Sequence, residues 1–474
     1  MTAESNRPLA SRNGRRAGWW LAASLLACLV GAGAAMASAD CAAYAACYDV
    51  VISPDLREVL VETRLPEGGK VRIPGGVRPD TISDCTGERM RMTAVDVRPP
   101  GGCLRIEASL VPSPLAAPGR RMDRFVSPDD WLPRPEVAGE RHLRLRPPPG
   151  MDVFVPWRRI GEHAYRIPSS PRSGRTLIDF GSFATRQLVA GDATLTLWVL
   201  DATLDADRLA AWLLPAVHSV ATVGGRFPSP HVQLVAQRGH DAGSPFDASP
   251  VPFGHVMRNG GEVVRFFVDP EATAQQLGAD WTAAHELSHL LLPYVHDREK
   301  WISEGFASYY QNLLMARQGQ YSALEMWQRL TRSFAAAGGI ASSATPGNAY
   351  RHPFWDVRLL VYWSGAAMAL MADVELRARA GGTQSLDSVL GALAACCLPS
   401  TRVWTGESLF AQLDALAGGA PVFMPLYHKV SDTPGMPDTS VLLRDLGVIG
   451  SGGDARLDDS AALADIRRSL TRVD

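Results

Sequence analysis

Hydrophobic and polar residues alternate over short stretches in the first part of the chain, from about Tyr48 to Leu200. An alternation of period two that is rich in β-branched residues is typical of strands that bury one face. The clearest examples are Tyr48–Ile52, Val59–Thr63 and Thr194–Leu200. Turn-forming clusters such as Pro147–Gly150 separate these stretches. The pattern therefore predicts a β-rich N-terminal domain, which we place at residues 40–204.

The pattern changes after residue 204. A helical segment from Asp205 to about Val223 is followed by two strand candidates, His231–Ala236 and Glu262–Val268. Beyond Asp280 the chain is rich in alanine and leucine at helical spacing. We therefore expect an α+β protein with a mainly helical domain at 205–418 and a C-terminal extension at 419–474. Because Glu262–Val268 directly precedes the helices, we expect it to be the edge strand of a cleft, open to strand addition by an extended peptide.

The first residues have the order of an export signal. Arg12, Arg15 and Arg16 precede an uncharged run from Ala17 to Ala37, which ends in the small-residue pattern Ala37-Ser38-Ala39. We therefore predict that 1–39 is a cleaved signal peptide and that the mature chain is periplasmic or secreted. The alternative is an uncleaved segment, because the run is long enough to span a bilayer. In that case the protein is membrane-anchored and faces the periplasm.

The amino-acid composition is typical of a globular protein that does not bind nucleic acids. Hydrophobic residues make up 46% and charged residues 20%, which excludes disorder over the whole length. The formal net charge is −2, and removal of the basic N-terminal segment makes the remainder more acidic. No basic excess remains to bind phosphates, so we expect no nucleic-acid partner.

The cysteines agree with an oxidising compartment. The chain has seven cysteines, and six remain when Cys28 of the predicted export signal is set aside. Four of the six cluster near the predicted mature N-terminus, where local disulfides are the simplest pairing, and two are adjacent: these are Cys41, Cys47, Cys85 and Cys103, then Cys396 and Cys397. Since a bond between neighbouring cysteines is strained, we expect the adjacent pair to bond elsewhere or to stay free.

The chemistry is concentrated in His285-Glu286-Leu287-Ser288-His289, a H-E-x-x-H sequence on a segment of helical character. Two histidines four residues apart lie on one face of a helix, about 6 Å apart along its axis, so both imidazoles can reach one ion. The intervening Glu286 lies beside them, where it can take a proton from an activated water. We predict one Zn²⁺ site, with Pro293 ending the helix.

A hydrolytic zinc site takes three protein ligands and leaves one position for water. His296 and Glu304 are the downstream candidates for the third ligand. Glu304 fits better, because Ser303 is a possible helix cap that places the carboxylate on the first turn of a second helix. His296 is then a solvated loop residue. Ser308, one helical turn past Glu304, is a candidate to hydrogen-bond a ligand.

Three segments resemble the gluzincin metallopeptidases, and in particular the glycyl aminopeptidase family. Residues 301–310 read W-I-S-E-G-F-A-S-Y-Y, which is similar to that family's S-E-G-F-T-S-Y-Y. Residues 362–377 are similar to its Y-x-K-G helix and D-x-E-L-R element, and 385–389 to its S-L-D-x-V element. The resemblance implies a thermolysin-like catalytic domain with zinc ligands His285, His289 and Glu304. It further implies that Glu286 is the general base and that Tyr362 stabilises the oxyanion.

The segment Gly254–Asn259 departs from the family's G-L-E-H-R-N loop. Val256 stands where the family has the glutamate that holds a substrate's free amine, and Gly254, His255 and Asn259 remain as candidate substrate-binding residues. Without that carboxylate, aminopeptidase specificity is doubtful, and endopeptidase or oligopeptidase activity is at least as well supported. In addition, Ser364 replaces the lysine of Y-x-K-G, and we expect no PDZ domain after residue 418.

Two functions from different classes follow from these motifs. The first is an exported zinc metallopeptidase that acts on a peptide or protein substrate. The alternative is a non-catalytic peptide-binding or scaffold protein that retains the peptidase fold, which the replacements at Val256 and Ser364 favour. A binding module has no need of Glu286, so the intact H-E-x-x-H favours the enzyme.

Overall fold

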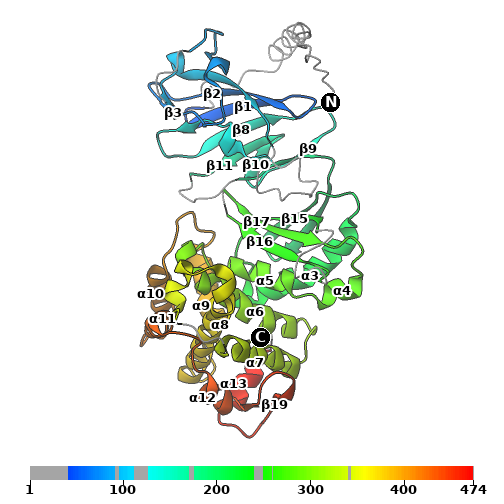
Figure 1. Ribbon diagram of the computed structural model, residues 1–474, viewed down its shortest axis with the longest axis vertical. Coiled ribbons are helices and arrows are strands. Elements are labelled where there is room, and N and C mark those ends of the chain that lie inside the picture. Colours follow the sequence, from blue (N-terminus) through cyan, green and yellow to red (C-terminus); the bar gives the residue numbers. More distant parts are fainter. Residues whose placement is uncertain are drawn as a thin grey trace, which may run out of the picture.

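The computed structural model describes residues 41–90, 95–111, 126–169, 176–239, 249–258, 260–339 and 343–472. The predicted export signal, with Cys28, lies outside the described residues. Figure 1 shows a β-rich N-terminal region, a second sheet in the middle of the molecule and a helical C-terminal region. This arrangement confirms the expected α+β architecture, with a β-rich region followed by a mainly helical one.

The N-terminal region is built on a seven-stranded sheet in the order β10-β11-β8-β1-β2-β6-β4. Along β1, Tyr48, Val50 and Ile52 are buried, as the period-two pattern predicted. A three-stranded sheet (β5-β3-β7) and a two-stranded one (β12-β9) complete the region. The strands are β1 Ala46–Ile52, β2 Glu58–Arg64, β3 Val71–Arg72, β4 Ile82–Asp84, β5 Asp96–Val97, β6 Cys103–Ser109, β7 Arg134–Pro135, β8 Arg141–Arg146, β9 Asp152–Phe154, β10 Arg158–Gly161, β11 Ala164–Ile167 and β12 Asp179–Gly181.

The second sheet has five strands in the order β13-β14-β15-β17-β16. They are β13 Ala184–Ala190, β14 Ala193–Val199, β15 His231–Arg238, β16 Phe253–Met257 and β17 Glu262–Val268. Two expectations change here. Since β14 pairs in parallel with β15, strands β13 and β14 belong to this sheet rather than to the N-terminal domain. The strand β17 lies inside the sheet, between β15 and β16, so the edge strand is β16.

Helices pack on one face of this sheet and form the rest of the chain (Figure 1). Asp205 begins the first of them by accepting hydrogen bonds from the backbone of Asp207 and Arg208. The helices are α3 Ala206–Thr222, α4 Ala274–Ala279, α5 Thr282–Ser288, α6 Lys300–Arg317, α7 Ala323–Gly338, α8 Phe354–Arg379, α9 Leu386–Cys397, α10 Gly406–Ala417, α11 Phe423–Asp432, α12 Ser440–Asp445 and α13 Ala464–Leu470. Short 3₁₀ turns include η5 His289–Leu291, η6 Asp297–Glu299 and η7 Pro346–Arg351, and a hairpin of β18 Val448–Ile449 and β19 Arg456–Leu457 lies near the end.

Helices α6 and α8 cross with their backbones almost in contact. A Cβ on Gly305 would lie 2.3 Å from the Cα of Gly365, and a Cβ on Gly365 would lie 2.2 Å from the carbonyl oxygen of Trp301. Any larger residue at either position would push the helices apart. These glycines follow Glu304 and Ser364 directly, so the close crossing fixes α8 next to the glutamate.

A buried polar network joins the motif helices. Tyr309 of α6 donates to Asp373 of α8 at 2.8 Å, and Tyr310 donates to Asp387 of α9 at 2.8 Å. Arg377 also donates to Asp373, at 2.9 Å. The tyrosines of S-E-G-F-A-S-Y-Y therefore bond the aspartates of the D-x-E-L-R and S-L-D-x-V elements. These two later motifs hold the helices together rather than reach the candidate site.

One helix among the described residues, α8, is long and apolar enough by composition to cross a membrane. Its apolar window is 72% buried inside the protein, where α8 packs against α6 and α7. This burial explains its composition, because a helix in the middle of a domain is apolar on several faces.

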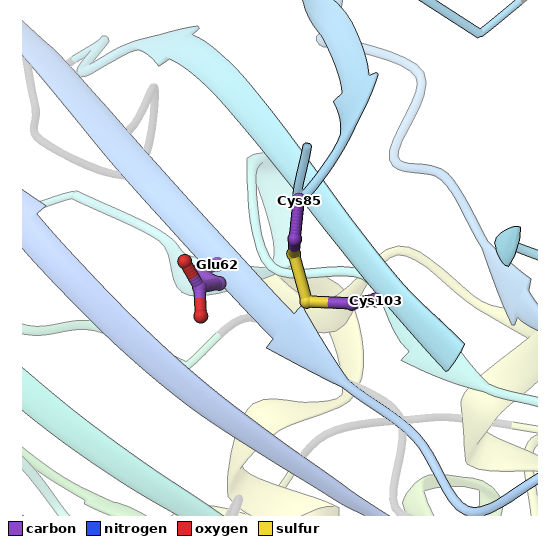
Figure 2. Close-up of side chains that lie close together, drawn as sticks. All are labelled: Glu62, Cys85 and Cys103. Atoms are coloured by element: carbon purple, nitrogen blue, oxygen red, sulfur yellow. A yellow bond between two sulfur atoms is a disulfide. The ribbon is translucent and has the colours of Figure 1, made fainter. Parts of the chain in front are cut away.

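The described cysteines form three disulfides. Local pairing near the mature N-terminus is confirmed by Cys41–Cys47 and Cys85–Cys103. The expectation for the adjacent pair was wrong, because Cys396 and Cys397 are bonded to each other at the end of α9. Figure 2 shows the Cys85–Cys103 bond with the Glu62 carboxylate nearby.

Candidate metal centre

The H-E-x-x-H segment forms α5 and the 3₁₀ turn that follows it. Asp280 accepts a hydrogen bond at 2.8 Å from the backbone of Thr282, the first residue of α5. All seven residues of α5 are buried. The α-helix ends at Ser288, so His289 begins the 3₁₀ turn η5, and the chain becomes extended at Leu292, one residue before Pro293.

Three side chains converge between α5 and α6. The Nε2 atoms of His285 and His289 lie 3.3 Å and 3.6 Å from Oε2 of Glu304. One ligand atom from each residue lies within 4.8 Å of the others. His285 is 3% exposed and Glu304 7%. The structure thus brings together the three residues predicted as ligands. His296 is exposed and accepts a hydrogen bond from the backbone of Arg298, so it does not join them.

Each imidazole is oriented by a polar side chain on α6. Nδ1 of His285 lies 3.1 Å from Oε1 of Gln311, and Nδ1 of His289 lies 2.9 Å from Oγ of Ser303. These contacts leave both Nε2 atoms facing Glu304. Ser303 does not cap α6, because the helix begins at Lys300. The expected contact of Ser308 is not formed, since its buried hydroxyl has no hydrogen-bond partner among the described residues.

Burial and charge set the protonation of the cluster. Burial lowers the pKa of His289 to about 3, which keeps this imidazole neutral. Burial alone would raise the pKa of Glu304, but hydrogen bonding to His285 and the positive charge of Lys300 lower it well below its usual range. The Nζ of Lys300 lies 3.2 Å from Oε1 of Glu304. A neutral imidazole and an ionised carboxylate are the forms that bind a metal.

Glu286 lies against the edge strand. A Cβ on Gly254 would lie 2.6 Å from Cγ of Glu286, so only glycine allows β16 to approach the glutamate this closely. Burial raises the pKa of Glu286 to about 7. Among the residues predicted to bind substrate, Gly254 therefore shapes the site through its missing side chain.

The other candidates on this segment lie differently. His255 points to the opposite face of the sheet from Gly254, because successive strand residues alternate, and its ring lies 5.5 Å from Phe253 and 6.2 Å from Phe267. It does not face α5, so its predicted role in substrate binding is not supported. Val256 packs against the core of the helical region, and it supplies no carboxylate. Asn259 lies outside the described residues.

Tyr362 projects from α8 toward the cluster. Its ring lies 5.9 Å from the ring of His285, with an interplanar angle of 22°. Burial, followed by the negative charges of Glu304 and Glu286, raises the pKa of Tyr362 above its usual value. The phenol therefore stays protonated and can donate a hydrogen bond. Ser364, two residues on, is fully buried and donates to the backbone oxygen of Leu360.

Sequence reasoning did not identify Arg258, which holds the turn that carries His289. Its guanidinium donates to the backbone oxygens of His289 and Leu292 and pairs with Glu262 at 3.0 Å. Arg258 is 9% exposed. The only signal for it in the sequence is its position directly after the strand β16.

Two imidazoles and one carboxylate, all largely buried and mutually in reach, form the donor set of a catalytic zinc site. The engaged Nδ1 atoms and the convergent Nε2 atoms show that these residues fit such an ion. This donor set, on a β-rich region followed by a helical one, resembles the class of gluzincin zinc peptidases.

Comparison with known proteins agrees with this class. The model of the M61 glycyl aminopeptidase family matches residues 292–351, which include Glu304. An aminopeptidase N family protein from Idiomarina loihiensis is 13% identical with a TM-score of 0.61, over 85% of this chain and 78% of that chain. A variant of a two-domain M1 zinc metallopeptidase bound to L-tryptophan is 14% identical with a TM-score of 0.50, over 83% and 95%. None of the curated proteins compared with the chain matches it.

These matches confirm the predicted resemblance to the glycyl aminopeptidase family of gluzincins. The family match covers the helix that carries Glu304, and the solved structures share the fold over most of the chain. Together they support a peptidase.

Proposed function

We propose that the chain is an exported zinc-dependent metallopeptidase that hydrolyses peptide bonds. The observation that carries this proposal is the buried cluster of His285, His289 and Glu304 with Glu286 beside it. A scaffold protein needs no carboxylate beside a metal site, and the close approach of Gly254 to Glu286 leaves that carboxylate packed against the strand that borders the site.

His285, His289 and Glu304 would hold the zinc ion. When bound, zinc polarises the scissile carbonyl and lowers the pKa of water toward about 7. Glu286, whose pKa burial raises to about 7, accepts a proton from the attacking water and passes it to the leaving amine. Tyr362 donates a hydrogen bond to the developing oxyanion, and one such donor supplies about 2.7 to 4 kcal/mol.

The edge strand β16 is the natural support for an extended substrate. Its inner edge pairs with β17, and no strand of the described residues pairs with the other edge, which can therefore pair with a peptide backbone. Because Val256 offers no carboxylate to a free amine, we propose that the enzyme cleaves within peptides rather than trims their N-termini. Gly254 lies on the same face as Val256 and leaves room for Glu286.

Measurement of zinc content together with cleavage of a mixed peptide library tests this proposal. The matched control is Glu286→Gln, which keeps the size of the side chain and removes the base. Wild type should bind zinc and cleave internal bonds, whereas the variant should bind zinc and lose about 10²- to 10⁴-fold in rate. Bound zinc without cleavage in either protein would favour the scaffold, and N-terminal trimming would contradict the specificity that we propose.

A further inference from the structure

Aromatic rings are exposed at the start of α8, next to the candidate metal centre. Tyr350 is 44% exposed, Phe354 38% and Trp355 64%. They lie in η7 and the first turn of α8, and Phe354 contacts Trp355 with ring centroids 5.6 Å apart. Clustered exposed aromatic side chains of this size mark interaction surfaces. We call Tyr350, Phe354 and Trp355, with the cations described next, the aromatic rim.

Arginines cover the rings of the aromatic rim. Arg298 and Arg351 lie over Tyr350 at 5.5 Å and 5.4 Å, and Arg358 lies over Trp355 at 5.8 Å. Within the described part of the chain, none of these three arginines pairs with a carboxylate. Their charges are therefore available to a ligand.

Three carboxylates are neighbours of these arginines in the sequence, and two of them accept hydrogen bonds from neutral groups. Asp297 accepts a hydrogen bond from the hydroxyl of Tyr294 at 2.8 Å. Glu299 accepts from the hydroxyl of Tyr427 at 2.7 Å and from the backbone of Gly406 at 2.8 Å. Asp356, in the first turn of α8, is the remaining acidic residue of the segment. Among the described residues none of these carboxylates forms an ion pair with Arg298, Arg351 or Arg358, so the rim offers guanidinium donors to a ligand rather than a net positive charge.

The aromatic rim adjoins the catalytic groups through Phe354. The ring of Phe354 lies 6.4 Å from the ring of Tyr362. On its other side, Nζ of Lys300 lies 5.1 Å from the ring of Phe354 and 3.2 Å from Oε1 of Glu304. Arg358 lies one helical turn before Tyr362 on α8. A substrate held at the candidate centre therefore passes beside the rim.

We propose that the aromatic rim selects peptide substrates with acidic side chains near the cleaved bond. This inference rests on the proposed peptidase function and names its substrate class. An aspartate or glutamate carboxylate would pair with Arg298, Arg351 or Arg358, which arginine does with two parallel hydrogen bonds. The exposed rings of Phe354 and Trp355 would pack against the apolar parts of the same segment.

The test compares two peptides of otherwise identical sequence. One has Asp and Glu near the cleaved bond, and the other has Asn and Gln at the same positions. The zinc-loaded wild type should show a kcat/KM about fivefold higher for the acidic peptide, as expected for a few partly exposed ion pairs. The triple variant Arg298→Gln, Arg351→Gln, Arg358→Gln should bring this ratio close to one. The control Arg57→Gln changes an exposed arginine between β1 and β2 of the N-terminal region and should keep the ratio.

Binding of the same two fluorescent peptides to the zinc-loaded Glu286→Gln protein separates the two proposals. Tighter binding of the acidic peptide, weakened by added salt, supports the rim even if turnover is absent. Equal Kd values and equal kcat/KM values for the two peptides would overturn the inference while leaving a peptidase intact. If wild type cleaves neither peptide faster than Glu286→Gln does, the proposed peptidase function fails. The difference between the two Kd values then decides alone whether the aromatic rim prefers acidic peptides.

Discussion

Two clusters in this chain each bring three side chains of metal-binding type within 4.8 Å of one another. One joins His285, His289 and Glu304 between α5 and α6, and the other joins Glu62, Cys85 and Cys103 in the N-terminal sheet (Figure 2). The two clusters differ in the bonds that their potential ligand atoms already form. In the first cluster the Nε2 atoms and a carboxylate oxygen face one another.

The second cluster has no free ligand atoms to offer. The sulfurs of Cys85 and Cys103 are bonded to each other. The carboxylate of Glu62 pairs with Arg64 at 2.6 Å and with Arg105 at 3.0 Å. Proximity of suitable residue types therefore does not make a metal site. What distinguishes the first cluster is that the surrounding side chains orient its ligands and leave their lone pairs available.

Removal of one carboxylate from each cluster tests the difference between the two clusters most directly. Glu304→Gln should reduce the zinc content from about one ion per chain to almost none and abolish peptide cleavage, because two histidines alone hold the ion weakly. Glu62→Gln should leave both unchanged. Metal analysis of the two purified variants measures the difference, and loss of zinc in Glu62→Gln alone would reverse the assignment.

The second cluster should contribute stability instead. Its disulfide spans 18 residues of chain, so the paired replacement Cys85→Ser, Cys103→Ser should lower the free energy of unfolding by about 3 kcal/mol. Chemical denaturation of both proteins gives this value. Zinc content should not change. A variant of wild-type stability that has lost zinc would show that the cluster is a metal site after all.

Orientation of the ligands can be tested at Gln311. Gln311→Ala frees Nδ1 of His285 and should weaken zinc affinity about 10- to 100-fold. Gln318→Ala, at the C-terminal end of α6, is the matched control and should bind zinc as wild type does. Competition with a chelator measures both affinities. Equal affinities would mean that the imidazole is held by packing alone.

A partly buried histidine, His255, lies outside both clusters. Burial lowers the pKa of His255 to about 3 from its usual 6.5. The unfolded chain then binds more protons than the folded chain between these pH values, so stability falls as pH decreases through this window. The loss is at most about 1.4 kcal/mol per pH unit. Between pH 7 and pH 4, the free energy of unfolding should depend less on pH in His255→Gln than in wild type. Denaturation at several pH values measures this dependence, and an equal dependence in both proteins would contradict the lowered pKa.

Local patterns predicted much of the site because its residues are close in sequence. The four-residue spacing of His285 and His289 requires only helical geometry, and the segment around Glu304 predicted the third member of the cluster. The contact of Gln311 with His285, in place of the one expected for Ser308, was missed. On a helix, Gln311 is rotated about 20° from Glu304 and Ser308 about 40°, so which one faces an imidazole depends on how α5 and α6 pack.

The order of the strands was predicted least well, because it also depends on how distant parts of the chain pack together. The alternation in Thr194–Leu200 shows that it is a strand but not which sheet it joins, and pairing with β15 is a contact between distant parts of the chain. The edge strand β16 has five residues and includes Gly254, which gives a weak strand signal. That glycine is present because Glu286 lies against it, a requirement that only the folded structure reveals.

The contact between Gly305 and Gly365 holds the proposed metal ligand Glu304 and the proposed oxyanion donor Tyr362 at one helix crossing. A bulkier side chain at either glycine would displace both residues together, so a single substitution would remove two proposed functions at once. Sequence variation is therefore constrained at this crossing by the geometry of two helices as well as by chemistry.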